Sequence, residues 1–137
     1  MVAPDAEPAT LAARLRLPGA GVAVGEGLLD PRAISSVGNM RRAEALWEAA
    51  ITPWARLGVL DDEALERVCA AVVRLMRGAL AGGQPRSSVY RRAGRPCPRR
   101  GTAIRSYPQG DDARLAYWCP GCRGPPEAGA GPSGAYL

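Results

Sequence analysis

A chain of 137 residues has the size of one compact domain with a modest hydrophobic core. It contains no Phe, so Leu, Val, Ala, Ile and three Trp must fill that core. No apolar run has the length of a membrane helix and no signal-peptide pattern opens the chain, so we expect a soluble protein of the cytoplasm.

The positive charge is concentrated in one part of the chain. All 18 basic residues are Arg, and the formal net charge is +5. Residues 84–123 contain nine Arg and two Asp, a formal charge of +7, whereas residues 1–83 contain nine Arg and ten acidic residues. A GC-rich codon bias explains the absence of Lys but not this asymmetry. Clustered Arg favours a phosphate-rich partner, because every neutralised phosphate releases counterions.

Two helical patterns flank a short turn in the first half of the chain. Residues 1–23 form a Pro- and Ala-rich lead in which Leu11, Leu15 and Leu17 have helical spacing. We then expect a helix over residues 24–29, a turn over residues 30–38, and a second helix from Asn39 to about residue 50. Apolar residues at helical spacing define the expected buried face of the second helix: Met40, Ala43, Leu46, Trp47 and Ala50.

A third and longer helix is predicted after the break at Pro53. Asp61 is a suitable N-cap, and the helix runs to about residue 81, where Gly82 and Gly83 end it. Its apolar stripe consists of Leu65, Val68, Cys69, Val72, Leu75, Met76, Ala79 and Leu80. Because Cys69 lies inside this stripe, we interpret it as a buried core thiol rather than a nucleophile or a ligand.

A β-hairpin is predicted between cysteines near the C-terminus. After a polar, basic connection over residues 84–96, strands are expected around residues 103–107 and 113–118. Cys97 precedes the first strand, and Cys119 and Cys122 follow the second. The Gly-, Pro- and Ala-rich residues 124–137 predict a disordered tail. The expected fold class is therefore mainly α, with a helical bundle followed by a small β-hairpin module.

Two motifs in this chain resemble one known family. Residues 25–47, GEGLLDPRAISSVGNMRRAEALW, resemble the helix–two-turns–helix segment of the formamidopyrimidine-DNA glycosylase and endonuclease VIII family. The matching positions are Gly25, Glu26, Leu28, Leu29, Asp30, Gly38, Asn39, Glu44, Ala45, Leu46 and Trp47. VYRRAGRPCPRRGTAIR and RLAYWCPGC resemble the family's zinc finger, most closely in its actinobacterial branch. The resemblance implies a helix–two-turns–helix domain over residues 24–83 and a zinc-finger-like hairpin over residues 84–123, with residues 1–23 opening the family's C-terminal domain.

The resemblance implies binding to double-stranded DNA, preferably damaged or abasic, and so a place at the nucleoid. The family's phosphate-binding Asn corresponds to Asn39, where Gly38 lets the backbone approach a phosphate at a helix N-terminus. Arg114 stands five residues before Cys119 and matches the family's zinc-finger Arg, which grips phosphates beside the damaged nucleotide. Electrostatic support is expected from Arg91, Arg92, Arg95 and Arg105. Taken alone, Gly-Asn is also typical of a turn with an N-cap, and Arg114 of a solvated hairpin tip.

The resemblance also implies a zinc ion, which the family holds with two Cys-x-x-Cys pairs. Here Cys97, Cys119 and Cys122 are present, but Arg100 stands at the position of the fourth Cys, and a guanidinium has no lone pair for a metal. Two outcomes stay open. Three thiolates and a water hold zinc, or the hairpin folds without metal and Arg100 places its charge where the cation would lie. Nothing predicts a disulfide framework.

The family consists of base-excision-repair enzymes that remove a damaged base and cleave the abasic strand, using an N-terminal Pro amine and a neighbouring Glu. This chain begins Met1-Val2-Ala3-Pro4 and has no Lys or His, so no catalytic residue is predicted and the catalytic N-terminal half is expected to be missing. The leading hypothesis is a damaged-DNA-binding C-terminal half, working as a fragment or with a separate catalytic domain.

Two alternatives remain open at this point. One is an active glycosylase and abasic-site lyase, which requires a longer chain or the chain's own N-terminal amine as nucleophile. The other is a non-enzymatic nucleic-acid-binding protein, because ribosomal proteins and topoisomerase subunits also use a helix–two-turns–helix.

Overall fold

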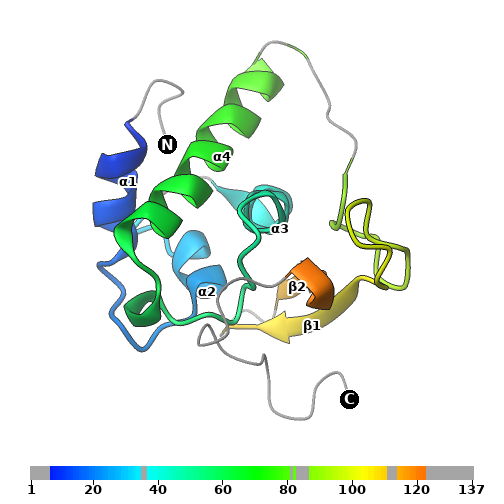
Figure 1. Cartoon of the computed structure of the whole chain (residues 1–137). Coiled ribbons are helices and arrows are strands. Elements are labelled where there is room, and N and C mark those ends of the chain that lie inside the picture. The colour runs from blue at the N-terminus through cyan, green and yellow to red at the C-terminus, as the bar shows by residue number, and fades with distance from the viewer. Residues whose placement is uncertain (1–6, 35–36, 81, 83–86, 111–113, 123–137) are drawn as a thin grey trace.

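The computed structural model describes residues 7–34, 37–80, 82, 87–110 and 114–122. Within these residues it contains four α-helices and one two-stranded antiparallel sheet, so the fold is mainly α, as predicted (Figure 1). The elements are α1 (Pro8–Leu15), α2 (Val24–Leu29), α3 (Gly38–Glu48), α4 (Asp62–Leu80), β1 (Arg105–Gln109) and β2 (Arg114–Trp118), with short 3₁₀ turns at Leu57–Val59 and Pro120–Cys122. None of the described helices is both long enough and apolar enough to cross a membrane.

Helix α3 occupies the centre of the molecule, where Figure 1 shows it end-on between α4 and the hairpin. It contacts α4, α2 and β2, and α4 also contacts α1. A single helix therefore joins the apolar core of the helical part to the β-hairpin.

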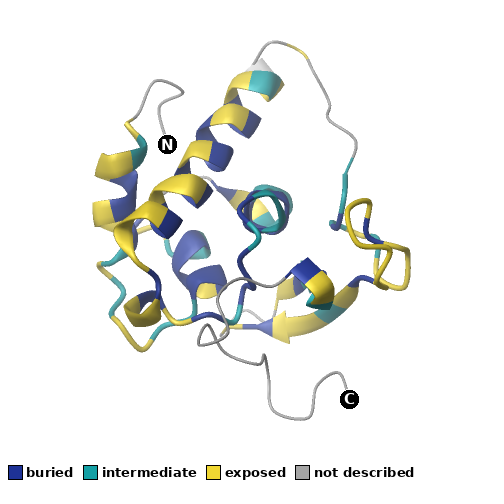
Figure 2. Cartoon of the chain, in the orientation of Figure 1, coloured by how far each residue is buried: buried dark blue, intermediate teal, exposed yellow. Residues whose placement is uncertain are grey.

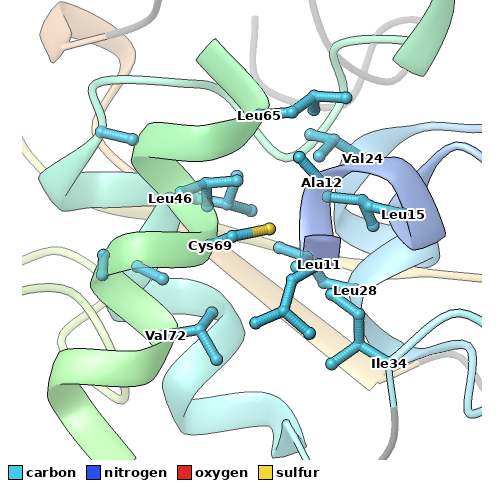
Figure 3. Close-up of a cluster of buried hydrophobic side chains, with 14 of the residues drawn as sticks. Leu11, Ala12, Leu15, Val24, Leu28, Ile34, Leu46, Leu65, Cys69 and Val72 are labelled. Carbon is cyan, nitrogen blue, oxygen red and sulfur yellow. The ribbon is translucent and has the colours of Figure 1, made fainter. Parts of the chain in front are cut away.

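The main core lies among the four helices (Figure 3). Leu15, Leu28, Leu65 and Cys69 have no exposed surface there. Each large aliphatic side chain buried in this way contributes about 2 kcal/mol of hydrophobic stabilisation. Figure 2 shows the consequence for α4, which is buried along one face and exposed along the other. The interpretation of Cys69 as a core thiol is confirmed, and burial raises the pKa of this thiol to about 12.

The predicted positions of the helices agree closely with the structure. Helix α2 covers the predicted residues 24–29. Helix α4 follows Asp61, whose carboxylate accepts the backbone N–H of Ala64 at 2.8 Å, as expected of an N-cap. After α4, Gly82 has a φ of +84°, a conformation that suits a glycine beyond a helix end. Gly83 and the predicted tail lie outside the described residues.

The ends of two predicted helical patterns differ from the structure. Leu17 lies beyond the end of α1 and is 67% exposed, and Ala79 near the end of α4 is exposed. The lead segment turns away after Leu15 towards α2, so Leu17 cannot follow the helical stripe. The side chain of Leu80 lies outside the described residues.

The buried face of α3 also differs from the prediction, and the helix begins one residue earlier, at Gly38. Ala43 and Leu46 are buried as expected, whereas Met40, Trp47 and Ala50 are only partly buried. Polar residues Arg42 and Glu44 are buried in their place. The reason is the central position of α3, because α4 covers one side of the helix and the hairpin with its connection covers another.

The hairpin lies against α3 with Gln109 paired to Arg114 and Arg105 paired to Trp118. Strand β1 begins two residues later than predicted, because Ala103 is held in an isolated bridge to Pro96. A two-stranded sheet has only edge strands, so it tolerates Pro108 within β1. A second small apolar cluster joins the hairpin to α3: Ala43, Val89, Cys97, Ile104, Cys119 and Cys122.

Candidate functional site

The start of α3 meets the start of β2 at Asn39. Its side-chain Nδ2 donates a hydrogen bond to the backbone carbonyl of Leu115 at 2.9 Å, across 76 residues of sequence. The N-cap residue of α3 is Val37, which makes no side-chain capping bond. Asn39 lies inside the first turn of the helix, so the alternative in which Asn39 is only an N-cap does not hold. Gly38 has a φ of +76°, a conformation that would be strained for any other residue. No atom lies where a Cβ would stand, so the backbone there is accessible. The amide of Asn39 thus faces the hairpin.

Arg42 lies one helical turn beyond Asn39 and is 1% exposed. Its Nη1 donates to Oε1 of Gln109 at 2.8 Å and, at 3.4 Å, to the carbonyl of Gly25. Its Nη2 donates to the Leu115 carbonyl at 3.1 Å and to Oδ1 of Asn39. Burial, with repulsion from the nearby Arg114 and a smaller opposing attraction to Glu26, lowers the pKa of Arg42 to about 10. The guanidinium is therefore charged at neutral pH.

The turn end of the hairpin is fixed against α2 by Gln109 and Gly25. Gln109 is 4% exposed and donates from Nε2 to the Pro53 carbonyl at 2.8 Å. Gly25 also donates its backbone N–H to that carbonyl, at 2.9 Å. A Cβ at Gly25 would lie 2.3 Å from Oε1 of Gln109, closer than any real contact, so only glycine fits. Gly25 of the sequence motif therefore permits the close approach of two segments.

Arg114 opens β2 and is exposed. An open groove of about 460 Å³ runs beside it between α2 and the hairpin. Glu26, Gln109, Gly110 and Arg114 supply its polar lining near the hairpin. Arg114 and Asn39 come from different elements, yet Arg114 precedes Leu115, the residue to which Asn39 binds. The structure thus brings together these two predicted site residues.

The other predicted basic residues are distributed over the hairpin module. Arg105 is exposed at the opposite end of the strand pair from Arg114, about 13 Å away along the strand. Arg91 is exposed, has a φ of +59°, and lies with its guanidinium 5.3 Å from the ring centroid of Tyr90. Arg92 is partly buried and Arg95 is exposed. Of the predicted basic residues, Arg114 is the one next in sequence to Leu115, to which Asn39 binds.

Cys97, Cys119 and Cys122 converge, with their sulfur atoms all within 4.8 Å of one another. The Sγ atoms of Cys97 and Cys122 are 3.5 Å apart. All three thiols are buried at the end of the hairpin, next to Trp47 of α3. The residue types and their spacing suit a thiophilic cation such as zinc.

The backbone around Cys97 has the geometry of a ligand-bearing turn. The carbonyl of Cys97 accepts the N–H of Gly101 at 2.8 Å, and Gly101 has a φ of +75°. Burial alone would raise the pKa of the Cys97 thiol, but hydrogen bonds from Trp47 Nε1, at 3.3 Å, and from the backbone of Arg100 and Arg99 lower it to about 6. This turn stabilises a thiolate.

The same turn carries Arg100, whose side chain is exposed and offers no ligand. Burial raises the pKa of Cys119 to about 11, together with hydrogen bonds to the other two thiols. The surroundings of Cys97 therefore favour a thiolate, whereas those of Cys119 favour a protonated thiol.

Glu44 is a site residue that the sequence analysis did not single out beyond its place in the motif. Its carboxylate is 6% exposed and accepts the backbone N–H groups of Ser88, Val89 and Tyr90, each at 2.9 Å. These bonds attach the connection after α4 to the side of α3.

The sequence contains a signal for the burial of Arg42. This residue precedes Ala45, Leu46 and Ala49 at helical spacing and so lies in an apolar stripe.

Comparison with solved structures shows which class of protein has this fold. The complex of Lactococcus lactis Fpg with abasic-site DNA matches with a TM-score of 0.71 over 86% of this chain and 47% of that chain, at 21% identity. At this identity the likeness establishes the fold alone. The fold is thus one that occurs in DNA glycosylases.

Sequence comparison establishes the family. The probable endonuclease 8 2 of Streptomyces coelicolor is 34% identical over 114 residues, which cover 76% of this chain and 41% of that protein. Formamidopyrimidine-DNA glycosylase of Parasynechococcus marenigrum is also 34% identical over 114 residues, 71% of this chain and 40% of that protein. The chain belongs to the formamidopyrimidine-DNA glycosylase and endonuclease VIII family. It spans less than half the length of these relatives. No family model matches the chain.

Proposed function

We propose that this chain is the damaged-DNA-binding half of a base-excision-repair glycosylase, equivalent to the C-terminal half of its family. Residues 24–83 would form the helix–two-turns–helix domain and residues 84–123 the zinc-finger-like hairpin. Its ligand would be double-stranded DNA with a damaged or abasic site. The family membership and the likeness to a protein bound to abasic-site DNA support this proposal.

The observation that carries the proposal is the contact between Asn39 and the Leu115 carbonyl. It joins a helix N-terminus, where backbone N–H groups attract anions, to the strand that begins with an exposed Arg. The Asn39 amide donates one N–H to Leu115 and has a second to offer, while the Arg114 guanidinium can bind a phosphate with two parallel hydrogen bonds. Two neighbouring phosphates of a kinked backbone are the ligand that such a pair fits.

Electrostatic attraction would come from the rest of the hairpin module. Gly38 leaves room for a phosphate next to the start of α3. The exposed guanidinium groups of Arg91, Arg95 and Arg105, with the partly buried Arg92, would raise affinity for any duplex. Contacts to phosphates carry no base information, so we expect little sequence specificity.

A zinc ion at Cys97, Cys119 and Cys122 is a second part of the proposal. Three protein ligands with a water in the fourth position form an established zinc arrangement, and the three converging thiols fit it. The metal would supply a cross-link between the two ends of the hairpin module. Arg100 at the fourth position predicts weaker retention than four thiolates would give.

The chemical steps would belong to a separate catalytic domain. Asn39, Arg42 and Arg114 suit binding rather than bond cleavage, because an amide and two guanidinium groups donate hydrogen bonds but are not nucleophilic amines. Borohydride trapping on abasic DNA separates this proposal from an active lyase. A covalent adduct with this chain would support the enzyme, whereas a binding module leaves no adduct.

Removal of either proposed phosphate contact tests the binding assignment. We expect Arg114→Ala to weaken binding to an abasic duplex about tenfold and Asn39→Ala to weaken it somewhat less, because the lost bonds are charge-assisted only for Arg114. Arg74→Ala is the matched control, since Arg74 pairs with Glu48 at the far end of α3. Unchanged affinity in both site variants would refute these two assignments.

A further inference from the structure

The two proposed phosphate contacts belong to different elements, and the side chain of Arg42 contacts both elements. Asn39 lies at the start of α3 and Arg114 at the start of β2. Arg42 donates from one nitrogen, Nη2, both to Oδ1 of Asn39 and to the carbonyl of Leu115. We propose that Arg42 is a positioning residue, which fixes Asn39 and the backbone beside Arg114 before DNA binds. This role rests on the proposed function.

The first effect of Arg42 concerns the orientation of the Asn39 amide. A guanidinium group only donates hydrogen bonds, so the atom of Asn39 that faces Arg42 must be the oxygen, Oδ1. The other end of the amide, Nδ2, is then turned to the Leu115 carbonyl. Without Arg42 only the bond to the Leu115 carbonyl would oppose a half-turn of the amide, so the turned form would become easier to reach. Such a turn would present an oxygen, rather than an N–H, to a phosphate.

The second effect concerns the hairpin at the level of Arg114. The Leu115 carbonyl accepts two hydrogen bonds, one from Arg42 at 3.1 Å and one from Asn39 at 2.9 Å. On the opposite strand, Gln109 pairs with Arg114 and accepts a bond from Nη1 of Arg42 at 2.8 Å. Both strands are therefore tied to α3 where Arg114 begins. The position of its backbone is set by a side chain 72 residues earlier in the chain.

The electrostatic setting of Arg42 also favours a positioning role. Its side chain is 1% exposed, and its Nε is buried with no described partner, so it cannot itself reach a phosphate as Arg114 can. A buried guanidinium beside a second one adds little to folding stability. A phosphate bound by Asn39 and Arg114 would neutralise the charge of Arg114 and so reduce its repulsion of Arg42. The arrangement suits binding more than stability.

Arg42→Met, Arg42→Lys and the control Arg67→Met test this role. Met keeps the length without any donor, Lys keeps the charge with fewer bonds, and Arg67 is an Arg of α4 that donates to the Ala49 carbonyl on another side of α3. We expect Arg42→Met to weaken duplex binding about tenfold, with partial rescue in Arg42→Lys and no change in Arg67→Met. In an Asn39→Ala background the effect of Arg42→Met should fall by more than half, because it acts through Asn39.

Two further readouts separate positioning from other roles. The salt dependence of binding should keep its wild-type slope in Arg42→Met, whereas loss of a direct phosphate contact lowers the slope by about 0.9. The side-chain amide resonances of Asn39 in nitrogen-15 spectra should shift in Arg42→Met and less in Arg42→Lys. A reduced slope, or affinity and Asn39 resonances equal to wild type, would overturn the proposal.

The proposal stays testable if Arg42→Met does not fold or if the wild-type chain binds no duplex. If Arg42→Met does not fold, Arg42→Lys decides, with unshifted Asn39 resonances as the contradicting result. If the wild-type chain binds no duplex, the proposed function fails. The Asn39 resonances then decide whether Arg42 orients the amide, and unshifted resonances overturn that claim as well.

Discussion

The helical part of the molecule and the hairpin module are stabilised by different interactions. Residues 8–80 enclose a continuous apolar core that includes side chains of all four helices. Residues 87–122 have a small apolar cluster, three converging thiols, and the carboxylate of Glu44 on the backbone of residues 88–90. The helical part therefore folds around hydrophobic burial, while the hairpin module combines a small apolar cluster with polar contacts to α3 and aromatic contacts to Trp54.

This difference explains why α3 carries the candidate site. It packs Leu46 into the main core and Ala43 into the cluster of the hairpin module, so it is fixed by the stable part. Its polar residues Asn39, Arg42 and Glu44 hold the less apolar part against it. A rigid helix thus positions a hairpin whose own core is small.

The largest expected effect comes from Glu44→Ala. It removes a buried carboxylate that accepts three backbone N–H groups and leaves those donors without partners, a loss of about 4 kcal/mol. Urea unfolding should show this loss, and amide hydrogen exchange should accelerate at Ser88, Val89 and Tyr90 before it does in α4. The matched control is Glu48→Ala, which removes a partly exposed ion pair with Arg74 and should cost about 0.5 kcal/mol. Unchanged exchange at residues 88–90 would contradict the attachment role.

An intermediate effect is expected where the hairpin module lacks a fourth thiol. Arg100→Cys should complete a four-thiolate site and tighten zinc binding, and a hundredfold gain adds about 2.7 kcal/mol of stability at fixed free zinc. Zinc content after dialysis and the thermal midpoint measure this gain. Cys69→Ala is the control, because Cys69 lies in the helical core and should leave zinc content unchanged. Equal zinc content in wild type and Arg100→Cys would show that Arg100 does not limit metal binding.

The smallest effect concerns backbone strain in the hairpin module. Arg91 has a φ of +59°, which costs a side-chain-bearing residue about 1 kcal/mol and costs glycine nothing. Arg91→Gly should therefore stabilise the protein by about 0.5 kcal/mol, once the greater freedom of glycine in the unfolded chain is subtracted. Arg95→Gly is the control, since its backbone has no positive φ and the change should destabilise. A lower midpoint in Arg91→Gly than in wild type would contradict this explanation.

The sequence predicts the helical part better than the site. The apolar spacing around Leu65 and Val72 located α4, because hydrophobic periodicity is a local property of the chain. Asn39 and Arg114 came from the family resemblance, and the structure brings them together. Arg42 and Glu44 look like solvent-facing residues of α3, since their partners Gln109 and Val89 are 67 and 45 residues away. The apolar stripe through Ala45 and Leu46 is a local signal for Arg42, but nothing local shows that a distant segment buries Glu44.

The most direct test of the central claim is a fluorescence anisotropy titration of the whole chain. It would compare an intact duplex with one that carries a stable abasic-site analogue, each at two salt concentrations. We predict salt-dependent binding with preference for the abasic duplex, and a salt slope that falls by about 0.9 in Arg114→Ala. Absence of binding to both duplexes at low salt, or equal slopes in wild type and Arg114→Ala, would contradict a phosphate-binding site at Asn39 and Arg114.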